Sequence, residues 1–125
     1  MLFGKVKENA VMSFIKKADK KIAEAFMSAN PMAAKDVVTK DMLDDLRVEV
    51  NFYRTHDRDK FDQERLMERT YTLISNNEDE AVVRRDITFK LARVGLHKVT
   101  MGFDFSELIT ISKTNGFAIS AISAA

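Results

Sequence analysis

The spacing of apolar residues changes near His97, and this change constrains the fold more than any other feature of the sequence. Before His97, apolar side chains recur every three to four positions, which is typical of amphipathic helices. From Val99 to Phe105 they alternate with polar or smaller residues, which is typical of half-buried strands. Because helices come first and strands come last, the sequence predicts the α+β class.

Two helices are predicted before residue 55. The first covers about residues 4–27 and ends before Pro31, the only proline, because a proline pushes the preceding residue out of the helical region. The second covers about residues 40–54, with Thr39 as its N-cap. Residues 46–53 also alternate as they would in a strand. The helical register holds over more residues, so a helix is favoured and a strand is the alternative.

Two more helices are predicted between residues 59 and 94. The third covers residues 59–75, where apolar side chains from Leu66 to Ile74 form one buried side. The fourth begins after Asn77, which has capping-box spacing to Glu80. It ends at about residue 94, where Gly95 is expected to supply the C-terminal cap. About four helices are therefore predicted in all.

A three-stranded antiparallel β-meander is predicted in residues 97–122. Its last hairpin is expected at Asn115-Gly116, because Asn-Gly between β-branched runs is a strong turn signal. The chain is expected to form a single domain, residues 1–125, with a helical part at about 4–96 and a β part at about 97–122.

The composition limits the classes of function. Basic and acidic residues nearly cancel, 20 against 19, so no overall field indicates a strongly charged partner. The absence of cysteine excludes a disulfide framework, a thiolate zinc site and a cysteine nucleophile, and it fits a reducing compartment. No run approaches the roughly 18 apolar residues of a membrane span, and no signal-peptide pattern opens the sequence. A cytoplasmic protein without a transmembrane segment is predicted.

The predicted role is non-enzymatic: an accessory protein that docks to another macromolecule, as a homodimer. The apolar strand residues and a fourth helix with two apolar sides would leave more apolar surface than a monomer this small easily covers. Symmetric pairing would cover that surface.

A basic cluster and an acidic row form the candidate interaction surface. The cluster consists of Lys16, Lys17, Lys20 and Lys21, and the row consists of Asp41, Asp45 and Glu49. Like charges four residues apart on a helix repel, so the basic face is expected to offset the acidic row, within one chain or across a dimer. Ordinary solvated helix faces are the alternative interpretation.

A nucleic-acid-binding regulator is the alternative function. The predicted third and fourth helices with the following hairpin resemble a winged helix-turn-helix in outline. Its candidate contacts are Arg84, Arg85, Lys90, Arg93 and Lys113. The basic N-terminal helix is a second candidate surface for phosphate contacts.

A small carboxylate-dependent enzyme is the third possibility. His56 and His97 are the only histidines, and the four glycines are too dispersed for a phosphate-binding loop. No acidic pair stands in an apolar context that would raise its pKa. The sequence therefore predicts no catalytic residue, no metal site and no cofactor.

Overall fold

The computed structural model describes residues 2–56, 67–89, 92–94, 97–99 and 103–125, and it confirms the α+β class. The helical elements are α1 (Leu2–Met27), the 3-10 helix η1 (Pro31–Val37) and α2 (Lys40–His56). The strands are β1 (Met67–Asn76), β2 (Glu80–Phe89), β3 (Ala92–Val94), β4 (His97–Val99), β5 (Phe103–Ser112) and β6 (Ala118–Ala124).

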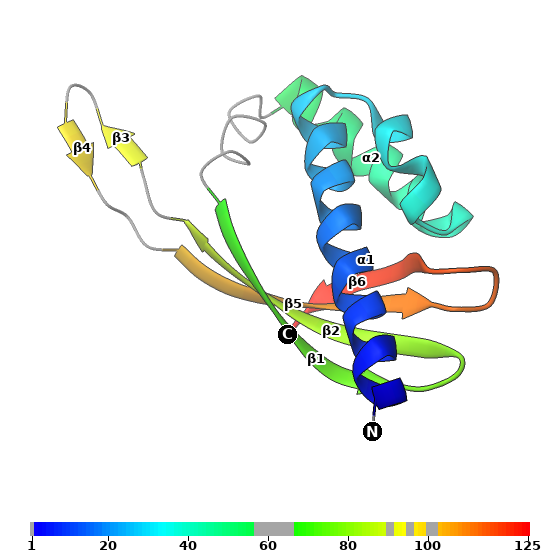
Figure 1. Cartoon of the computed structure of the whole chain (residues 1–125). Helices are drawn as coiled ribbons and strands as arrows, with labels where there is room; N and C mark the ends of the chain where they lie inside the picture. Colours follow the sequence, from blue (N-terminus) through cyan, green and yellow to red (C-terminus); the bar gives the residue numbers. More distant parts are fainter. Residues whose placement is uncertain (1, 57–66, 90–91, 95–96, 100–102) are drawn as a thin grey trace.

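The four longest strands form one antiparallel sheet in the order β1-β2-β5-β6. The helices gather on one face of this curved sheet (Figure 1). A separate ribbon of β3 and β4 lies beyond the ends of β2 and β5, away from the helices (Figure 1). The predicted three-stranded meander is therefore wrong in detail, because β4 pairs with β3, whereas β5 and β6 continue the sheet that β1 and β2 begin.

The helices predicted at residues 59–75 and up to residue 94 are wrong where the structure describes them, because strands β1 and β2 stand there. In β2, Ala81, Val83, Arg85 and Ile87 are buried, and the residues between them are not. An arginine at an inward position breaks the alternation of apolar and polar residues that marks a strand. The first part of the predicted third helix, residues 59–66, and the Gly95 cap lie outside the described residues.

The predicted helix of about residues 40–54 is confirmed as α2, and it includes residues 46–53. Thr39 is its N-cap, as predicted, because the Thr39 side-chain oxygen accepts a hydrogen bond from the Met42 amide at 3.3 Å. The Thr39 amide donates to the Ile119 carbonyl at 2.9 Å, so the start of α2 is attached to β6. This attachment holds α2 over the end of the sheet.

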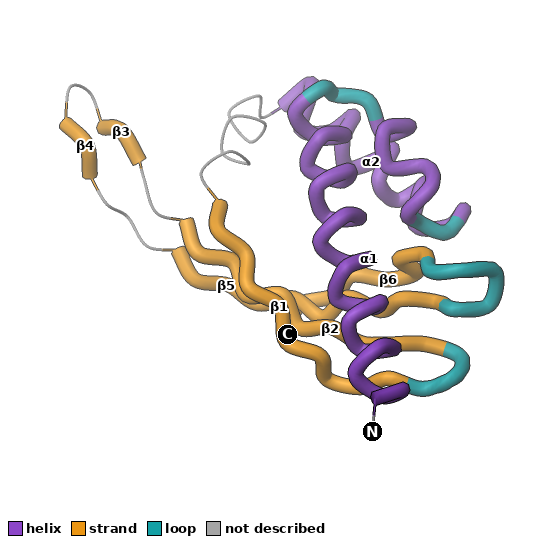
Figure 2. The backbone as a smooth tube through the Cα atoms, viewed as in Figure 1, coloured by secondary structure: helices purple, strands orange, loops and turns teal. Residues whose placement is uncertain are grey.

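Asparagine residues form both hairpin turns of the sheet, which lie at the same end (Figure 2). Asn77 does not cap a helix. Its side-chain oxygen accepts hydrogen bonds from the amides of Asp79 and Glu80, both at 3.0 Å, and so closes the β1-β2 turn. The predicted hairpin at Asn115-Gly116 is confirmed between β5 and β6, and Gly116 adopts a φ of 84°, which an L side chain rarely adopts.

The core lies between α1 and the covered face of the sheet. Val11, Ile15 and Ala18 of α1 are fully buried in one cluster with Ile109 and Ile111 of β5. Leu46 and Val50 of α2 and Val83 of β2 belong to the same cluster. No helix in the described ranges is both long and apolar enough to cross a membrane.

Candidate ligand-binding site

A carboxylate stands on the buried side of α1. Asp19 follows Ala18 and precedes Ile22 on the face that packs against the sheet, and only 3% of its surface is exposed. The hydroxyl of Tyr71 in β1 donates a hydrogen bond to Asp19 Oδ2 at 2.5 Å. The Nε atom of Arg69, also in β1, lies 3.4 Å from the same oxygen. A buried carboxylate requires such partners, because desolvation disfavours its charge.

Arg85 of β2 completes the cluster. Its side chain is 8% exposed and donates to Asp19 Oδ1 and, at 3.1 Å, to Glu107 Oε2 of β5. Burial alone would lower the pKa of Arg85, but the charges of Asp19 and Glu107 raise it above its usual range. Arg85 Nε is buried and has no hydrogen-bond partner among the described residues. We refer to Asp19, Arg69, Tyr71, Arg85 and Glu107 as the charge cluster.

Tyr71 is held in its protonated form. Burial raises the pKa of the Tyr71 hydroxyl, and the negative charge of Asp19 raises it further. The hydroxyl therefore remains a hydrogen-bond donor to Asp19 throughout the physiological range. Because the pKa values of Tyr71 and Arg85 both move away from neutrality, neither side chain is suited to exchange a proton in a reaction at neutral pH.

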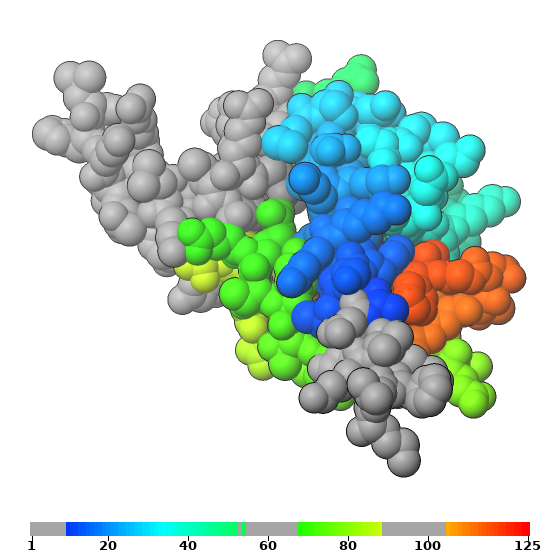
Figure 3. Space-filling view, in the orientation of Figure 1, coloured from blue at the N-terminus to red at the C-terminus, as the bar shows by residue number. Residues whose placement is uncertain are grey.

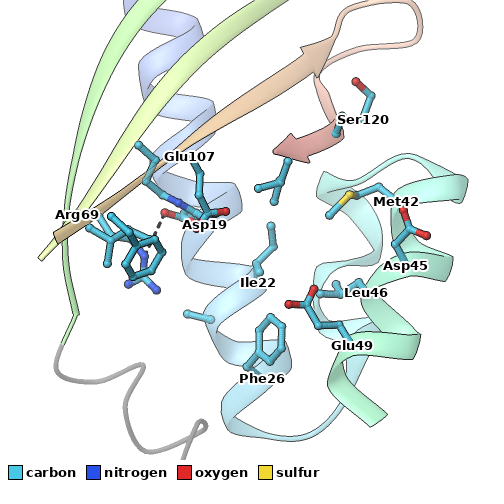
Figure 4. Close-up of a pocket in the computed structure, with 16 residues that line it drawn as sticks. Asp19, Ile22, Phe26, Met42, Asp45, Leu46, Glu49, Arg69, Glu107 and Ser120 are labelled. Carbon is cyan, nitrogen blue, oxygen red and sulfur yellow. Dashed lines mark hydrogen bonds and ion pairs between the residues drawn. The ribbon is translucent and has the colours of Figure 1, made fainter. Parts of the chain in front are cut away.

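A cavity of about 370 Å³ opens beside the charge cluster, between α1, α2 and the sheet. Figure 4 shows Asp19, Arg69 and Glu107 at one side of it, and Asp45 and Glu49 of α2 at the other. Its apolar lining comes from both helices and the sheet: Ile22, Phe26, Met42, Leu46, Ile87, Phe105 and Ile122. Six charged side chains and Ser120 complete the lining, so the cavity offers polar and apolar contacts in similar measure.

The lining of the cavity has an excess of negative charge. Asp19, Asp45, Glu49 and Glu107 supply four carboxylates, against the guanidinium groups of Arg69 and Arg85. Arg85 is occupied by Asp19 and Glu107. Asp45 forms no ion pair within the described part of the chain. The electrostatics of the cavity therefore favour a positively charged group over an anion.

The structure divides the predicted interaction surface. Asp45 and Glu49 line the cavity, whereas Asp41 does not. Lys16 and Lys20 line a second hollow, between α1 and β1, whereas Lys17 and Lys21 line neither. No ion pair joins the basic cluster to Asp41 or Asp45 in the described ranges. The predicted offset within one chain is therefore not found for these two aspartates.

The predicted nucleic-acid contacts do not form one surface. Arg84 and Arg85 are neighbours in a strand and point to opposite faces: Arg85 is buried, and Arg84 is exposed and pairs with Asp86 at 3.0 Å. Lys113 lies in the β5-β6 turn and donates to the Asn77 carbonyl at 2.7 Å. Lys90 lies outside the described residues, and Arg93 lies in β3. The recognition helix on which the winged-helix interpretation depends is strand β2.

Two histidines are the only candidates for histidine chemistry. His56 is the last residue of α2, and His97 begins β4. Across the described ranges, no three of the His, Asp and Glu side chains are grouped closely enough to hold a metal ion.

Within the charge cluster, the sequence predicts a functional role only for Arg85, and that role is contact with nucleic acid. One signal was present in the sequence. Asp19 lies four residues after Ile15 and three before Ile22, so it stands within the apolar stripe of the first helix. A carboxylate at such a position predicts a buried partner, because an unpaired buried charge is strongly destabilising. Its partners could not be found this way, because they come from two separate strands, β1 and β2.

Comparison of the sequence with models of known protein families and with curated proteins finds no match. The function must therefore be argued from the cavity and the charges around it.

Proposed function

We propose that this protein is a non-enzymatic binding protein whose ligand has an apolar body and a positively charged group. The observation that carries the proposal is the cavity, which combines an apolar lining with four carboxylates against two guanidinium groups. Its volume, about 370 Å³, falls at the small end of the range for small-molecule sites.

The geometry supports one orientation of the ligand. The apolar body would lie between Ile22 and Phe26 of α1 and the sheet, where it would be removed from water. The positive group would lie near Asp45 and Glu49, on the side of the cavity opposite Arg69 (Figure 4). Binding rather than catalysis is supported because Asp19 pairs with both Tyr71 and Arg85, and its negative charge raises the pKa of each, which keeps both side chains protonated.

A pair of test ligands with the same chain and opposite charge tests this proposal. Hexylammonium is expected to bind at least roughly tenfold more tightly than hexanoate, a difference of about 1.4 kcal/mol. Nuclear magnetic resonance titration of the ¹⁵N-labelled protein measures both affinities. The shifted amides should lie around Ile22, Leu46 and Ile122, which line the cavity.

Two double variants of α2 separate the site from the general charge of the protein. Asp45→Asn with Glu49→Gln removes two carboxylates that line the cavity, and it should abolish the preference for hexylammonium. Asp41→Asn with Asp44→Asn removes the same charge from exposed positions that do not line the cavity, and it should preserve the preference. Equal affinities for the two ligands in the unmodified protein, or equal effects of the two double variants, would refute the proposal.

Docking to a second copy of the chain is the second candidate function, and an exposed stripe on α2 favours it. Val48 and Phe52, four residues apart, are 72% and 53% exposed. Asp41 and Asp45 fall on the same side of the helix by its 3.6-residue period. The exposed Lys17 on α1 offers a complementary charge, and a twofold axis would repeat the contact. A homodimer in the cytoplasm would use this surface.

Light scattering at increasing concentration tests the dimer. The expected result is a mass that rises from monomer to dimer, and Val48→Glu with Phe52→Glu should restore the monomer. Ile74→Glu, at another exposed apolar residue, serves as the control and should leave the dimer intact. A monomer mass at the highest concentration would exclude this candidate.

A further inference from the structure

A second hollow lies on the other side of the Asp19–Arg69 ion pair. It has a volume of about 300 Å³ and opens where α1 meets β1. Figure 3 shows this surface, with α1 in blue beside β1 in green. The lining residues are Lys16, Asp19, Lys20 and Ala23 of α1 and Arg69 and Tyr71 of β1. Asp19, Ala23 and Arg69 also line the cavity, so the charge cluster stands between the two spaces.

The charge of this hollow is opposite to that of the cavity. Lys16, Lys20 and Arg69 supply three positive charges, and Asp19 is the single carboxylate. Asp19 already accepts hydrogen bonds from Tyr71 and Arg85, so little of its charge is left to neutralise the lysines. Lys16 and Lys20 form no hydrogen bond or ion pair with another described residue. Two like charges four residues apart on a helix repel each other. An anion bound between them would relieve this repulsion.

Arg69 distinguishes this hollow from an ordinary basic helix face. Its side chain is only 17% exposed, and its Nε atom lies 3.4 Å from Asp19 Oδ2, an ion pair without a hydrogen bond at this atom. The two lysines extend from the adjacent turn of α1, and the small side chain of Ala23 leaves the space between α1 and β1 open. Guanidinium and ammonium groups are both common ligands of phosphate groups.

We propose that this hollow binds a small dianion of the phosphate-monoester class. Lys16 and Lys20 would contact its oxygens from α1, and Arg69 would contact them from β1. Tyr71 would not contact the anion, because its hydroxyl donates its hydrogen bond to Asp19. This assignment divides the basic cluster: Lys16 and Lys20 form the site, whereas Lys17 and Lys21 lie on the same helix outside it. The site does not depend on a ligand in the cavity.

Titration with inorganic phosphate tests the proposal, at constant ionic strength and above the second phosphate pKa. Amide resonances of Lys16, Lys20 and Arg69 are expected to shift with a saturable curve, and chloride at the same ionic strength should not shift them. Lys16→Gln with Lys20→Gln should weaken phosphate binding by at least roughly tenfold, since it removes two charged hydrogen-bond donors. Both lysines are exposed, so the fold should persist.

Lys17→Gln with Lys21→Gln is the matched control, because it removes the same charge from the same helix. This variant should bind phosphate within about twofold of the unmodified protein, since its lysines do not line the hollow. The binding of a single-stranded oligothymidylate by both double variants is measured as well, because it reports on a general polyanion surface. If both double variants lose phosphate and oligonucleotide binding equally, the cluster is a general polyanion surface and the proposal is wrong. Absence of a saturable shift with phosphate would equally overturn it.

Discussion

Replacing Asp19 with asparagine is expected to lower the free energy of unfolding by about 3–5 kcal/mol. Counted over whole residues, Asp19 is 3% exposed and Arg85 is 7% exposed, and the carboxylate balances the charge of the guanidinium. Without its charge, Arg85 keeps only Glu107 as an anionic partner within the described ranges, and Arg69 loses the anion 3.4 Å from its Nε atom. Breaking a buried pair by removing one partner leaves a buried charge without compensation, which is more destabilising than removing both. Urea unfolding measures the change.

Two further variants show whether the effect comes from the buried pair. Asp44→Asn removes a carboxylate from an exposed position on α2 and should change stability by less than about 0.5 kcal/mol. Arg85→Gln combined with Asp19→Asn should lose less than the sum of the two single variants, because residues in contact are coupled by up to about 3 kcal/mol. Strict additivity would mean that Asp19 does not stabilise Arg85.

Replacing Ile109 with alanine is expected to lower the free energy of unfolding by about 2–5 kcal/mol. Ile109 is fully buried in β5, a central strand of the sheet, between Val83 of β2 and Ile122 of β6. The loss combines the transfer free energy of the removed carbon atoms with the cavity that they leave in the core. Denaturant unfolding with an unchanged slope would show that the folded state, and not the unfolded chain, is affected.

The same substitution at Ile74 is the matched control. Ile74 lies in β1, an edge strand, and is 54% exposed. Ile74→Ala should therefore change stability by less than about 1 kcal/mol, because a half-exposed side chain loses little burial and leaves no cavity. If the two alanine variants were equally stable, the packing of α1 on β5 would not be the core of this protein.

The α+β class and the first two long helices could be predicted because their signals are local. The apolar stripe of α1 and the cap of α2 at Thr39 depend on residues a few positions apart. The β5-β6 hairpin could be predicted from Asn115-Gly116, a local turn signal, and Gly116 supplies the positive φ in its loop. The sequence pattern did not predict strands β1 and β2, because Arg69 and Arg85 occupy inward positions that are apolar in most sheets.

The same two arginines show why the candidate site was missed. A basic residue in a sequence is read as exposed, since most are. Arg84 and Arg85 have neighbouring numbers, but the pleat of β2 places one outside and the other against Asp19. The helical period places Lys16 beside Lys20 and Lys17 beside Lys21, but only the packing of α1 against the sheet decides which pair lines the hollow.

The sequence by itself determined which segments near its ends become helix and hairpin, because caps, turns and helical periodicity act over a few residues. Only the tertiary structure decided that Asp19 meets Tyr71, Arg69 and Arg85, and that this cluster separates a negative cavity from a positive hollow. The physical reason is that the partners that stabilise the buried Asp19 lie 50 or more positions away along the chain, such as Tyr71, 52 residues from it. The spacing of neighbouring residues in the sequence does not reveal such pairs.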